Sequence, residues 1–281
     1  MLLEVLGVFV VGSLYWAPFA LAAAACAVVL VSAPVVIASA ARRATRRAPS
    51  SPTTFFRGAQ TEHDGRLNLE TTDDPHFVAA AAKTTVRAAG AGKRAVDIAA
   101  ALALLIFFAP LLALVAILIK LDSPGPVLYR QRRVGRDGQV FDILKFRSMV
   151  ADAEKNGVRW ARKNDDRVTR VGRIIRKLRI DEMPQAVNIL RGDMSFVGPR
   201  PERPEFVKLL ESEVPAYTLR HAVRPGLTGW AQVKYVYGAS VEDARVKLQY
   251  DLYYIKHFSL WRDFLIMLMT VRVALLGVGS R

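Results

Sequence analysis

Cysteine is almost absent from the sequence: Cys26 is the single one, and it lies inside an apolar stretch. One cysteine excludes a disulfide framework and a cysteine-type metal site within a single chain, and it fits a domain that faces the reducing cytosol. Acidic residues are also scarce, because 25 Asp and Glu stand against 40 Lys and Arg and leave a net charge of +15. A nucleic-acid-binding protein would explain this charge but not the hydrophobic content of 52%. A protein that lies on an anionic membrane leaflet and handles phosphate groups would explain both.

The 281 residues allow one catalytic domain of about 150–200 residues with attachments. The first attachment is residues 1–41, which are almost wholly apolar from Val5 onward and contain Pro18 and Pro34. Because a single span needs about 20 apolar residues, we expect one transmembrane helix here. The four arginines of "RRATRR" follow directly, so the positive-inside rule places the N-terminus outside and the remainder of the chain in the cytosol. A hairpin of two helices broken near Pro18 is the alternative.

Residues 42–92 carry small and polar side chains without sustained periodicity, as in "APSSPTTFF" and "TEHDGRLNLETTDD". Such a composition cannot bury enough apolar surface to order itself. We therefore expect a flexible cytosolic linker.

A second apolar stretch, "VDIAAALALLIFFAPLLALVAILIK", lies within residues 93–120. As one straight helix it would be roughly 36 Å long, enough to cross a bilayer. However, Pro110 follows Ala109 near its centre and breaks or kinks a helix. Both flanks are also basic, so neither end favours leaving the cytosol. These features predict a re-entrant helix–break–helix that enters one leaflet and returns; a proline-kinked span is the alternative.

Residues 121–281 have the composition of a soluble domain rich in Gly and Pro turns. Two strand-like pieces, "PVLYRQRRVG" and "QVFDILKFRSM", precede longer helical pieces, which we expect near residues 168–191, 203–213 and 241–276. The fold class is therefore a helix-rich α/β domain, membrane-associated through the segments before it. The last helix is apolar enough to lie against the membrane or to pack in the core.

Arginines recur at every third position in "DRVTRVGRIIRKLRIDE" and end beside a pair of carboxylates, Asp181 and Glu182. On a helix this row forms a slowly drifting basic stripe. Most of it fits a solvated face or a face that lies on anionic lipid headgroups. The members nearest Asp181 fit a phosphate-binding role, because guanidinium groups match phosphate oxygens in pairs.

Pro184 is tolerated in a first helical turn but not in a helix interior. The basic helix therefore ends near Ile180, and a new helix starts near Asp181 and stops at Gly192. A carboxylate at a helix N-terminus is held ionised by the helix dipole, and such a site also attracts phosphate. An ionised aspartate can attack phosphorus, and a neighbouring glutamate can hold Mg²⁺. An isolated Asp-Glu pair is, however, most often a simple helix cap.

Three long motifs occur in order: "SPGPVLYRQRRVGRDGQVFDILKFRSM", "DDRVTRVGRIIRKLRIDEMPQAVNILRGDMSFVGPRPERPEF" and "RHAVRPGLTGWAQV". With the proline-broken apolar segment, they closely resemble the bacterial sugar transferase family of monotopic polyprenyl-phosphate phosphoglycosyl transferases. The resemblance covers residues 93–279 and is nearest to the members that initiate exopolysaccharide or O-antigen synthesis. One departure is Ala109, because many members carry Ser-Pro at the membrane break.

The resemblance implies transfer of a sugar-1-phosphate from a UDP-sugar to a polyprenyl phosphate, with release of UMP. It implies that Asp181 is the nucleophile that carries the phosphosugar covalently, and that Glu182 assists with Mg²⁺ and with protons. Both carboxylates would contact the metal. The matching substrate-binding positions are Lys145, Arg147, Arg176, Pro199, Arg200, Pro201 and Arg224.

The same resemblance implies a location in the bacterial cytoplasmic membrane, with the catalytic domain facing the cytosol. The expected partners are the UDP-sugar donor, the polyprenyl phosphate acceptor, the inner membrane and downstream glycosyltransferases; a homodimer is compatible with the sequence, and nucleic acid is not expected. Two other functions stay open. A non-catalytic, membrane-anchored basic protein that binds anionic lipid or nucleic acid would not need the carboxylate pair, and an ordinary glycosyltransferase would release UDP.

Overall fold

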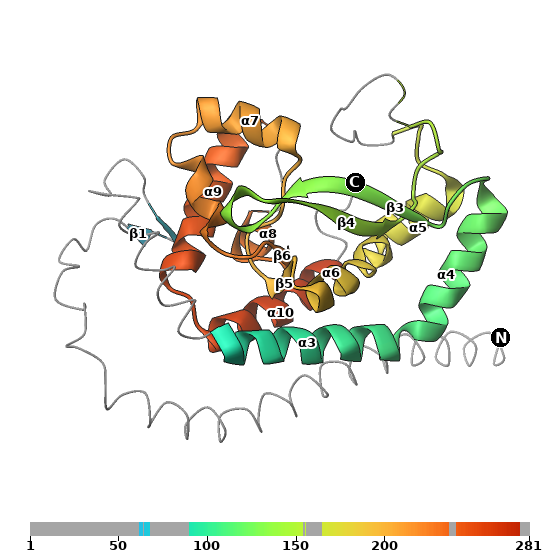
Figure 1. The fold of residues 1–281 in the computed structure, drawn as a ribbon, viewed down its shortest axis with the longest axis horizontal. Helices are drawn as coiled ribbons and strands as arrows, with labels where there is room; N and C mark the ends of the chain where they lie inside the picture. Colours follow the sequence, from blue (N-terminus) through green and yellow to red (C-terminus); the bar gives the residue numbers. More distant parts are fainter. Residues whose placement is uncertain are drawn as a thin grey trace, which may run out of the picture.

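The computed structural model describes residues 62–63, 65–67, 90–153, 155, 165–235 and 240–275 (Figure 1). The predicted transmembrane segment, residues 1–41, lies outside these described residues. Within them, the short strands pair as three two-stranded sheets, and helices supply most of the remaining regular structure. The helix-rich α/β fold class is therefore confirmed.

Two apolar helices, α3 (Gly90–Phe107) and α4 (Ala109–Asp122), meet with a bend of 62°. Pro110 lies in the first turn of α4, where its missing N–H costs nothing and its ring prevents α3 from continuing. Figure 1 shows α3 along one edge of the domain and α4 turning away from its end. In the described part of the chain no single helix is long and apolar enough to span a membrane, whereas this bent pair satisfies the length and composition. The predicted break at Ala109 and Pro110 is thus confirmed.

Buried polar contacts fasten the start of α3 to the rest of the domain. Asp97 is 2% exposed, and its Oδ1 accepts hydrogen bonds from Ser195 Oγ at 3.0 Å and from the Phe196 amide at 2.9 Å. Lys93 pairs with Asp263 at 2.6 Å. Helices α3 and α4 also expose many apolar side chains, namely Leu102, Ile106, Phe107, Leu114, Ile117, Leu118 and Leu121.

A β-hairpin forms one wall of the domain. Strand β3 (Leu128–Val134) pairs antiparallel with β4 (Val140–Phe146) across the turn η2 (Arg136–Gly138), with Tyr129 opposite Lys145. Side chains alternate along a strand, and directly opposed residues share a face. Arg133 and Lys145 therefore point to the same side of the hairpin.

The predicted helical pieces are more divided than expected. Residues 203–213 form α7 as expected, but the piece at 168–191 is broken twice and the piece at 241–276 is broken once, between residues 256 and 260. Two helical elements, η4 and α8, lie outside the predicted pieces. The helical elements after residue 168 in the described part of the chain are α5 (Arg170–Lys177), the 3-10 turn η3 (Ile180–Glu182), α6 (Gln185–Arg191), α7 (Pro204–Glu213), the 3-10 helix η4 (Tyr217–Ala222), α8 (Trp230–Lys234), α9 (Val241–Lys256) and α10 (Leu260–Leu275).

Two short parallel strands, β5 (Ser195–Val197) and β6 (Gly226–Thr228), lie at the centre of the domain. The backbone just after β5 passes so close to β6 that a Cβ on Gly198 would lie 2.5 Å from the Arg224 carbonyl oxygen. A Cβ on Gly226 would lie 2.1 Å from the Gly198 amide nitrogen. The two glycines therefore permit the approach that places the following loop, residues 199–202.

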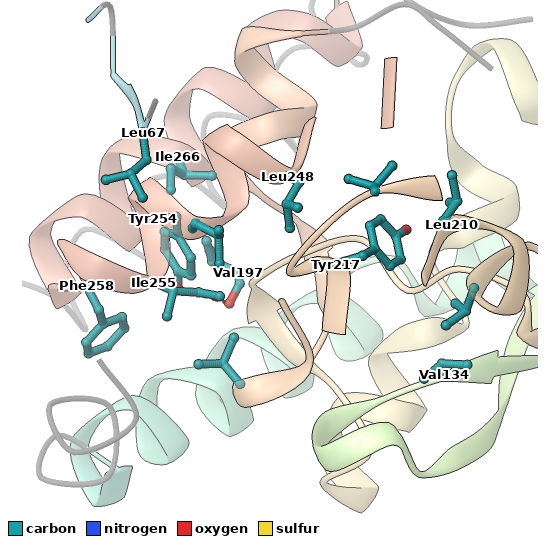
Figure 2. Close-up of a cluster of buried hydrophobic side chains, with 14 residues drawn as sticks. Leu67, Val134, Val197, Leu210, Tyr217, Leu248, Tyr254, Ile255, Phe258 and Ile266 are labelled. Atoms are coloured by element: carbon teal, nitrogen blue, oxygen red, sulfur yellow. Dashed lines mark hydrogen bonds between the residues drawn. The ribbon is translucent and has the colours of Figure 1, made fainter. Parts of the chain in front are cut away.

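The largest hydrophobic cluster lies between η4, α7, α9 and α10 (Figure 2). Leu248, Leu252, Ile255 and Ile266 are fully buried in it. Because α10 contributes Ile266 to this core, that part of α10 packs inside the domain. The core fixes α9 against β5 and so supports the loop that follows β5.

The segment expected to be a flexible linker is ordered where it is described. Strands β1 (Glu62–His63) and β2 (Arg66–Leu67) form a hairpin, and Leu67 is fully buried in the main cluster beside Ile266 (Figure 2). Trp230 Nε1 donates a hydrogen bond of 2.7 Å to the Gly65 carbonyl oxygen. The linker prediction is therefore wrong at these residues, because a buried leucine and an indole hydrogen bond dock them on the domain.

Candidate active site

Backbone breaks between two helices position the carboxylate pair. Helix α5 starts after Thr169, whose Oγ1 accepts a hydrogen bond of 2.9 Å from the Gly172 amide. It ends at Lys177, and Arg179 then adopts a left-handed conformation with φ of 58°. The pair follows in η3, one turn before α6, which stops at Gly192 with φ of 97°. The predicted break near Ile180 and the stop at Gly192 are confirmed, but the carboxylates precede the α6 N-terminus.

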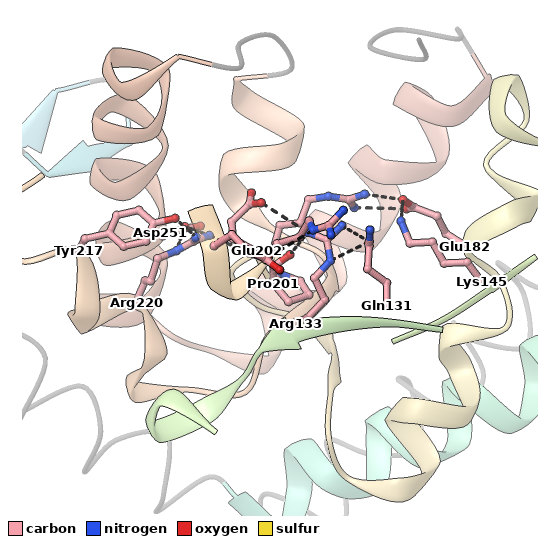
Figure 3. Close-up of polar contacts among 12 residues, drawn as sticks. Gln131, Arg133, Lys145, Glu182, Pro201, Glu202, Tyr217, Arg220 and Asp251 are labelled. Carbon is pink, nitrogen blue, oxygen red and sulfur yellow. Dashed lines mark hydrogen bonds and ion pairs between the residues drawn. The ribbon is translucent and has the colours of Figure 1, made fainter. Parts of the chain in front are cut away.

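The Glu182 carboxylate pairs with two cations, Lys145 and Arg200. It is 9% exposed, its Oε1 lies 3.2 Å from Lys145 Nζ, and both of its oxygens accept hydrogen bonds from the Arg200 guanidinium (Figure 3). Burial alone would raise the pKa of Glu182, but the charges of Arg200 and Lys145 outweigh burial and hold it well below its ordinary value. Glu182 is therefore a permanent anion in the site.

Asp181 is in a different state although it is the next residue. It is also 9% exposed, and burial followed by the charge of Glu182 raises its pKa to about 6. Lys145, Arg176 and Arg179 oppose that rise. Asp181 is therefore mostly ionised at pH 7. The sequence led us to expect that the helix dipole would hold this carboxylate ionised, but its pKa is raised, because burial contributes most.

Lys145 comes to the site from β4. Its side chain is 16% exposed, and burial lowers its pKa even though Glu182 opposes that change. Two residues of β3, Gln131 and Arg133, lie on the same face of the hairpin and join the same polar layer (Figure 3). Gln131 Oε1 accepts from Arg133 Nε at 3.1 Å and from Arg133 Nη2 at 2.6 Å.

The loop at residues 199–202 is held through its carbonyl oxygens. Pro199 accepts from the Gly226 amide at 2.9 Å, and Arg200 accepts from Arg220 Nη2 at 2.9 Å. Pro201 accepts from Arg133 Nη1 at 3.0 Å, and Glu202 accepts from the Val134 amide at 2.9 Å. Pro199, Arg200 and Pro201, predicted to bind substrate, therefore lie in one braced loop, which brings Arg200 to Glu182.

Two predicted substrate contacts have other partners here. The Arg147 guanidinium donates to the carbonyl oxygens of Pro124 at 2.7 Å and Ser123 at 2.7 Å, and so fastens β4 to the end of α4. Arg224 Nε donates to the Gly192 carbonyl oxygen at 2.9 Å, which closes the end of α6. No described hydrogen bond or ion pair joins either residue to the carboxylate pair. Both residues brace the main chain in this structure, and their role in substrate binding stays a prediction.

The arginine row splits into separate environments. Arg167 precedes the helix and is buried in an ion pair of 2.6 Å with Asp165, whereas Arg170 and Arg173 are exposed. Arg176 is half-buried and close enough to Asp181 to lower its pKa. Among the described residues, no hydrogen bond or ion pair involves the Arg176 guanidinium. It is therefore available to an anionic ligand at Asp181.

The described residues contain no group of three or more His, Cys, Asp or Glu side chains that could hold a metal ion. Among the described residues, the predicted pair of Asp181 and Glu182 would supply two carboxylates. Such a pair suits Mg²⁺, which proteins often bind through one or two carboxylates while substrate phosphates complete the shell.

The model of the bacterial sugar transferase family matches residues 88–277. The chain belongs to this family. The UDP-N-acetylgalactosamine-undecaprenyl-phosphate N-acetylgalactosaminephosphotransferase of Aeromonas hydrophila is 53% identical over 189 residues, which are 67% of this chain and 45% of that protein. The UDP-glucose:undecaprenyl-phosphate glucose-1-phosphate transferase of Caulobacter vibrioides is 50% identical over 181 residues, 64% of this chain and 68% of that protein. The exopolysaccharide production protein PSS of Rhizobium leguminosarum is 45% identical over 185 residues, 64% of this chain and 92% of that protein.

These family-related proteins carry two different sugars in their names, and the match spans less than half of the Aeromonas protein. Sequence reasoning within the family found the carboxylate pair and its two cations, but it missed the residues that brace them. Those residues are Gln131, Arg133, Tyr217, Arg220 and Asp251. The alternation of Gln131 and Arg133 along a strand could have indicated that they share a face. No local signal connects Arg220 with Asp251.

Proposed function

We propose that the protein is a phosphoglycosyl transferase that moves a sugar-1-phosphate from a UDP-sugar to a polyprenyl phosphate of the undecaprenyl type, and so initiates synthesis of an exopolysaccharide or other surface glycan. The observation that carries the proposal is the unequal carboxylate pair. Glu182 is an anion paired with Lys145 and Arg200, while Asp181, whose pKa is about 6, lies beside Arg176. This is the arrangement that a nucleophile needs when its target is an anionic phosphate.

In the proposed first step, an Asp181 carboxylate oxygen attacks the β-phosphorus of the UDP-sugar. The bond from that phosphorus to the bridging oxygen breaks, UMP leaves with the bond's electron pair, and an aspartyl-phosphosugar forms. In the second step, a phosphate oxygen of the polyprenyl phosphate attacks the same phosphorus and releases the Asp181 carboxylate. The products are UMP and a polyprenyl-diphospho-sugar, and no proton or redox partner is needed.

The cations around the pair have separate tasks in this mechanism. Arg176 lies beside Asp181 and binds the donor phosphates, so that two anions can approach each other. Lys145 and Arg200 keep Glu182 fixed and ionised. Mg²⁺ held by Asp181 and Glu182 would screen the negative charge of the diphosphate.

The bent pair α3 and α4 enters one leaflet in this proposal and returns to the cytosolic side of the bacterial inner membrane. The exposed apolar face of the pair supports this arrangement. Downstream glycosyltransferases would extend the lipid-linked sugar. Cysteines at Gly90 and Lys120, in a Cys26→Ser background, should both be protected from an impermeant thiol reagent in intact cells. Labelling of one of the two would show a crossing segment.

The activity test uses the full chain in membranes with undecaprenyl phosphate, Mg²⁺ and a panel of UDP-sugars that includes UDP-N-acetylgalactosamine and UDP-glucose. We expect release of UMP with at least one donor. Release of UDP would indicate an ordinary glycosyltransferase, and no turnover with any donor would favour the non-catalytic lipid-binding protein.

The covalent step has its own test. Given donor alone, the wild-type protein should retain phosphosugar on the peptide that contains Asp181 and release UMP. Asp181→Asn should retain none and lose turnover. Glu182→Gln should bind metal more weakly and turn over slowly, yet still trap some adduct. An adduct on Glu182 by mass spectrometry, or full activity in Asp181→Asn, would overturn the roles.

A further inference from the structure

The loop that presents Arg200 has an unusual support. Pro199 and Pro201 have no N–H, so the loop can be fixed mainly through its carbonyl oxygens. All four carbonyl oxygens of residues 199–202 accept hydrogen bonds, from β6, Arg220, Arg133 and the end of β3. Three of these donors belong to β-strands or their ends, whereas Arg220 comes from η4 and reaches the loop with its side chain.

All three guanidinium nitrogens of Arg220 donate hydrogen bonds inside the protein. It is 5% exposed, its Nε donates to Asp251 Oδ2 at 3.1 Å, and its Nη1 donates to the Tyr217 hydroxyl at 2.6 Å. Its Nη2 lies 2.8 Å from Asp251 Oδ2 and donates to the Arg200 carbonyl oxygen at 2.9 Å (Figure 3). Asp251 is 2% exposed on α9. No described hydrogen bond or ion pair joins Arg220 or Asp251 to either carboxylate of the pair.

Such a cluster is costly for stability alone. A buried ion pair often stabilises a protein no more than apolar side chains of the same volume would, because both charges lose their hydration. Here the Arg220–Asp251 ion pair also fixes one main-chain atom, because Arg220 donates a hydrogen bond to the Arg200 carbonyl oxygen. The Arg200 side chain then meets both oxygens of Glu182.

We propose that Arg220 and Asp251 are positioning residues for the reaction: they fix the main chain of Arg200 so that its guanidinium holds Glu182 in place beside the nucleophile. This inference rests on the proposed function. The line of contact runs from Asp251 on α9, through Arg220, to the Arg200 backbone and then to Glu182. Arg220 acts only through Arg200 and touches neither substrate nor the reacting carboxylate.

The test variant replaces the whole cluster with apolar side chains: Arg220→Met, Asp251→Leu and Tyr217→Phe together. It leaves no buried charge unpaired, so it should fold where a single substitution would not. The matched control is Arg167→Met with Asp165→Leu, which removes another buried Arg–Asp pair that makes no described contact with the loop. We expect kcat for UMP release to fall about 10- to 100-fold in the test variant, with KM for the donor changed less than about threefold, because a misplaced group costs the transition state most. The control should keep kcat within about threefold of the wild type.

Two further measurements separate positioning from stability. In an Arg200→Ala background, the cluster replacement should cause almost no additional loss, since residues on one line of contact are not additive. Hydrogen exchange of the peptide spanning residues 198–203 should be faster in the test variant than in the control. Additive losses with unchanged exchange would overturn the inference. If the wild type releases no UMP with any donor, the proposed function fails, and the exchange measurement still decides whether the cluster orders the loop.

Discussion

Docking of the β1–β2 hairpin on the domain can be tested with two glycines that have similar φ angles but different surroundings. Gly65 has φ of +75°, and a Cβ there would lie 2.9 Å from Trp230 Cζ2. Gly138, in the distant turn η2, has φ of +77° and nothing within 4 Å of its Cβ position. Alanine at either position has the same backbone strain, but only Gly65→Ala pushes against the surface on which the hairpin docks.

The expected magnitudes follow from these contacts. A left-handed alanine costs about 1–2 kcal/mol, and overpacking against the indole adds about 1–3 kcal/mol. Gly65→Ala should therefore favour local opening of the hairpin by about 2–5 kcal/mol. Trp230→Phe removes the donor to the Gly65 carbonyl oxygen and should favour opening by about 1 kcal/mol.

Tryptic cleavage after Arg66, followed by mass spectrometry of the native protein, measures this opening, because each 1.4 kcal/mol changes the open population tenfold. Rates are normalised to cleavage of the same bond in denatured protein. We expect acceleration of about 30- to 4,000-fold for Gly65→Ala, about fivefold for Trp230→Phe, and none for Gly138→Ala. Equal, wild-type cleavage in all three variants would refute the docking.

Two other predictions concern the site and its surroundings. Lys145→Met and Arg176→Ala should each lower kcat/KM about 10- to 1,000-fold as positioned charges are lost, whereas the paired replacement Arg167→Met with Asp165→Leu should change it far less; equal losses in all three variants would contradict separate roles. Burial and then the charge of Arg220 lower the pKa of His221 to about 4, so its contribution to stability is complete above pH 6.5 and is lost as the pH falls from 6.5 to 4. The wild type should lose about 2 kcal/mol more than His221→Phe between pH 7.5 and 5, seen as a larger drop in melting temperature in detergent; parallel drops would contradict the assignment.

Local sequence features predicted the elements that local physics controls. Pro110 breaks the apolar segment and Gly192 ends α6, because each residue carries its own conformational restriction or freedom. The two strand-like pieces form β3 and β4, as their local sequence predicted. By contrast, residues 65–67 are ordered because Leu67 packs against α9 and α10, whose residues are nearly 200 positions away in the sequence. A polar, aperiodic segment gives no sign of such a docking surface.

The arginines show the same limit within the site. Arg147 and Arg200 both stand in long motifs of the family and could each have bound substrate or main chain. Arg147 reaches carbonyl oxygens at the end of α4, and Arg200 reaches Glu182. Their partners are set by how α4 and the loop after β5 pack, which neighbouring residues in the sequence do not encode.

The pKa of Asp181 shows why even a correctly identified site residue can be assigned the wrong dominant force. A helix dipole stabilises a nearby carboxylate by about 0.3–1 kcal/mol, which would move its pKa down by less than one unit. The rise from 3.8 to about 6 corresponds to roughly 3 kcal/mol in the opposite direction. Burial and the charge of Glu182 supply that larger effect, and Glu182 can exert it because Lys145 and Arg200 keep it ionised. The pKa of the proposed nucleophile is therefore set by its burial and by Glu182, and the charge of Glu182 depends in turn on cations from β4 and the braced loop, far from Asp181 in the sequence.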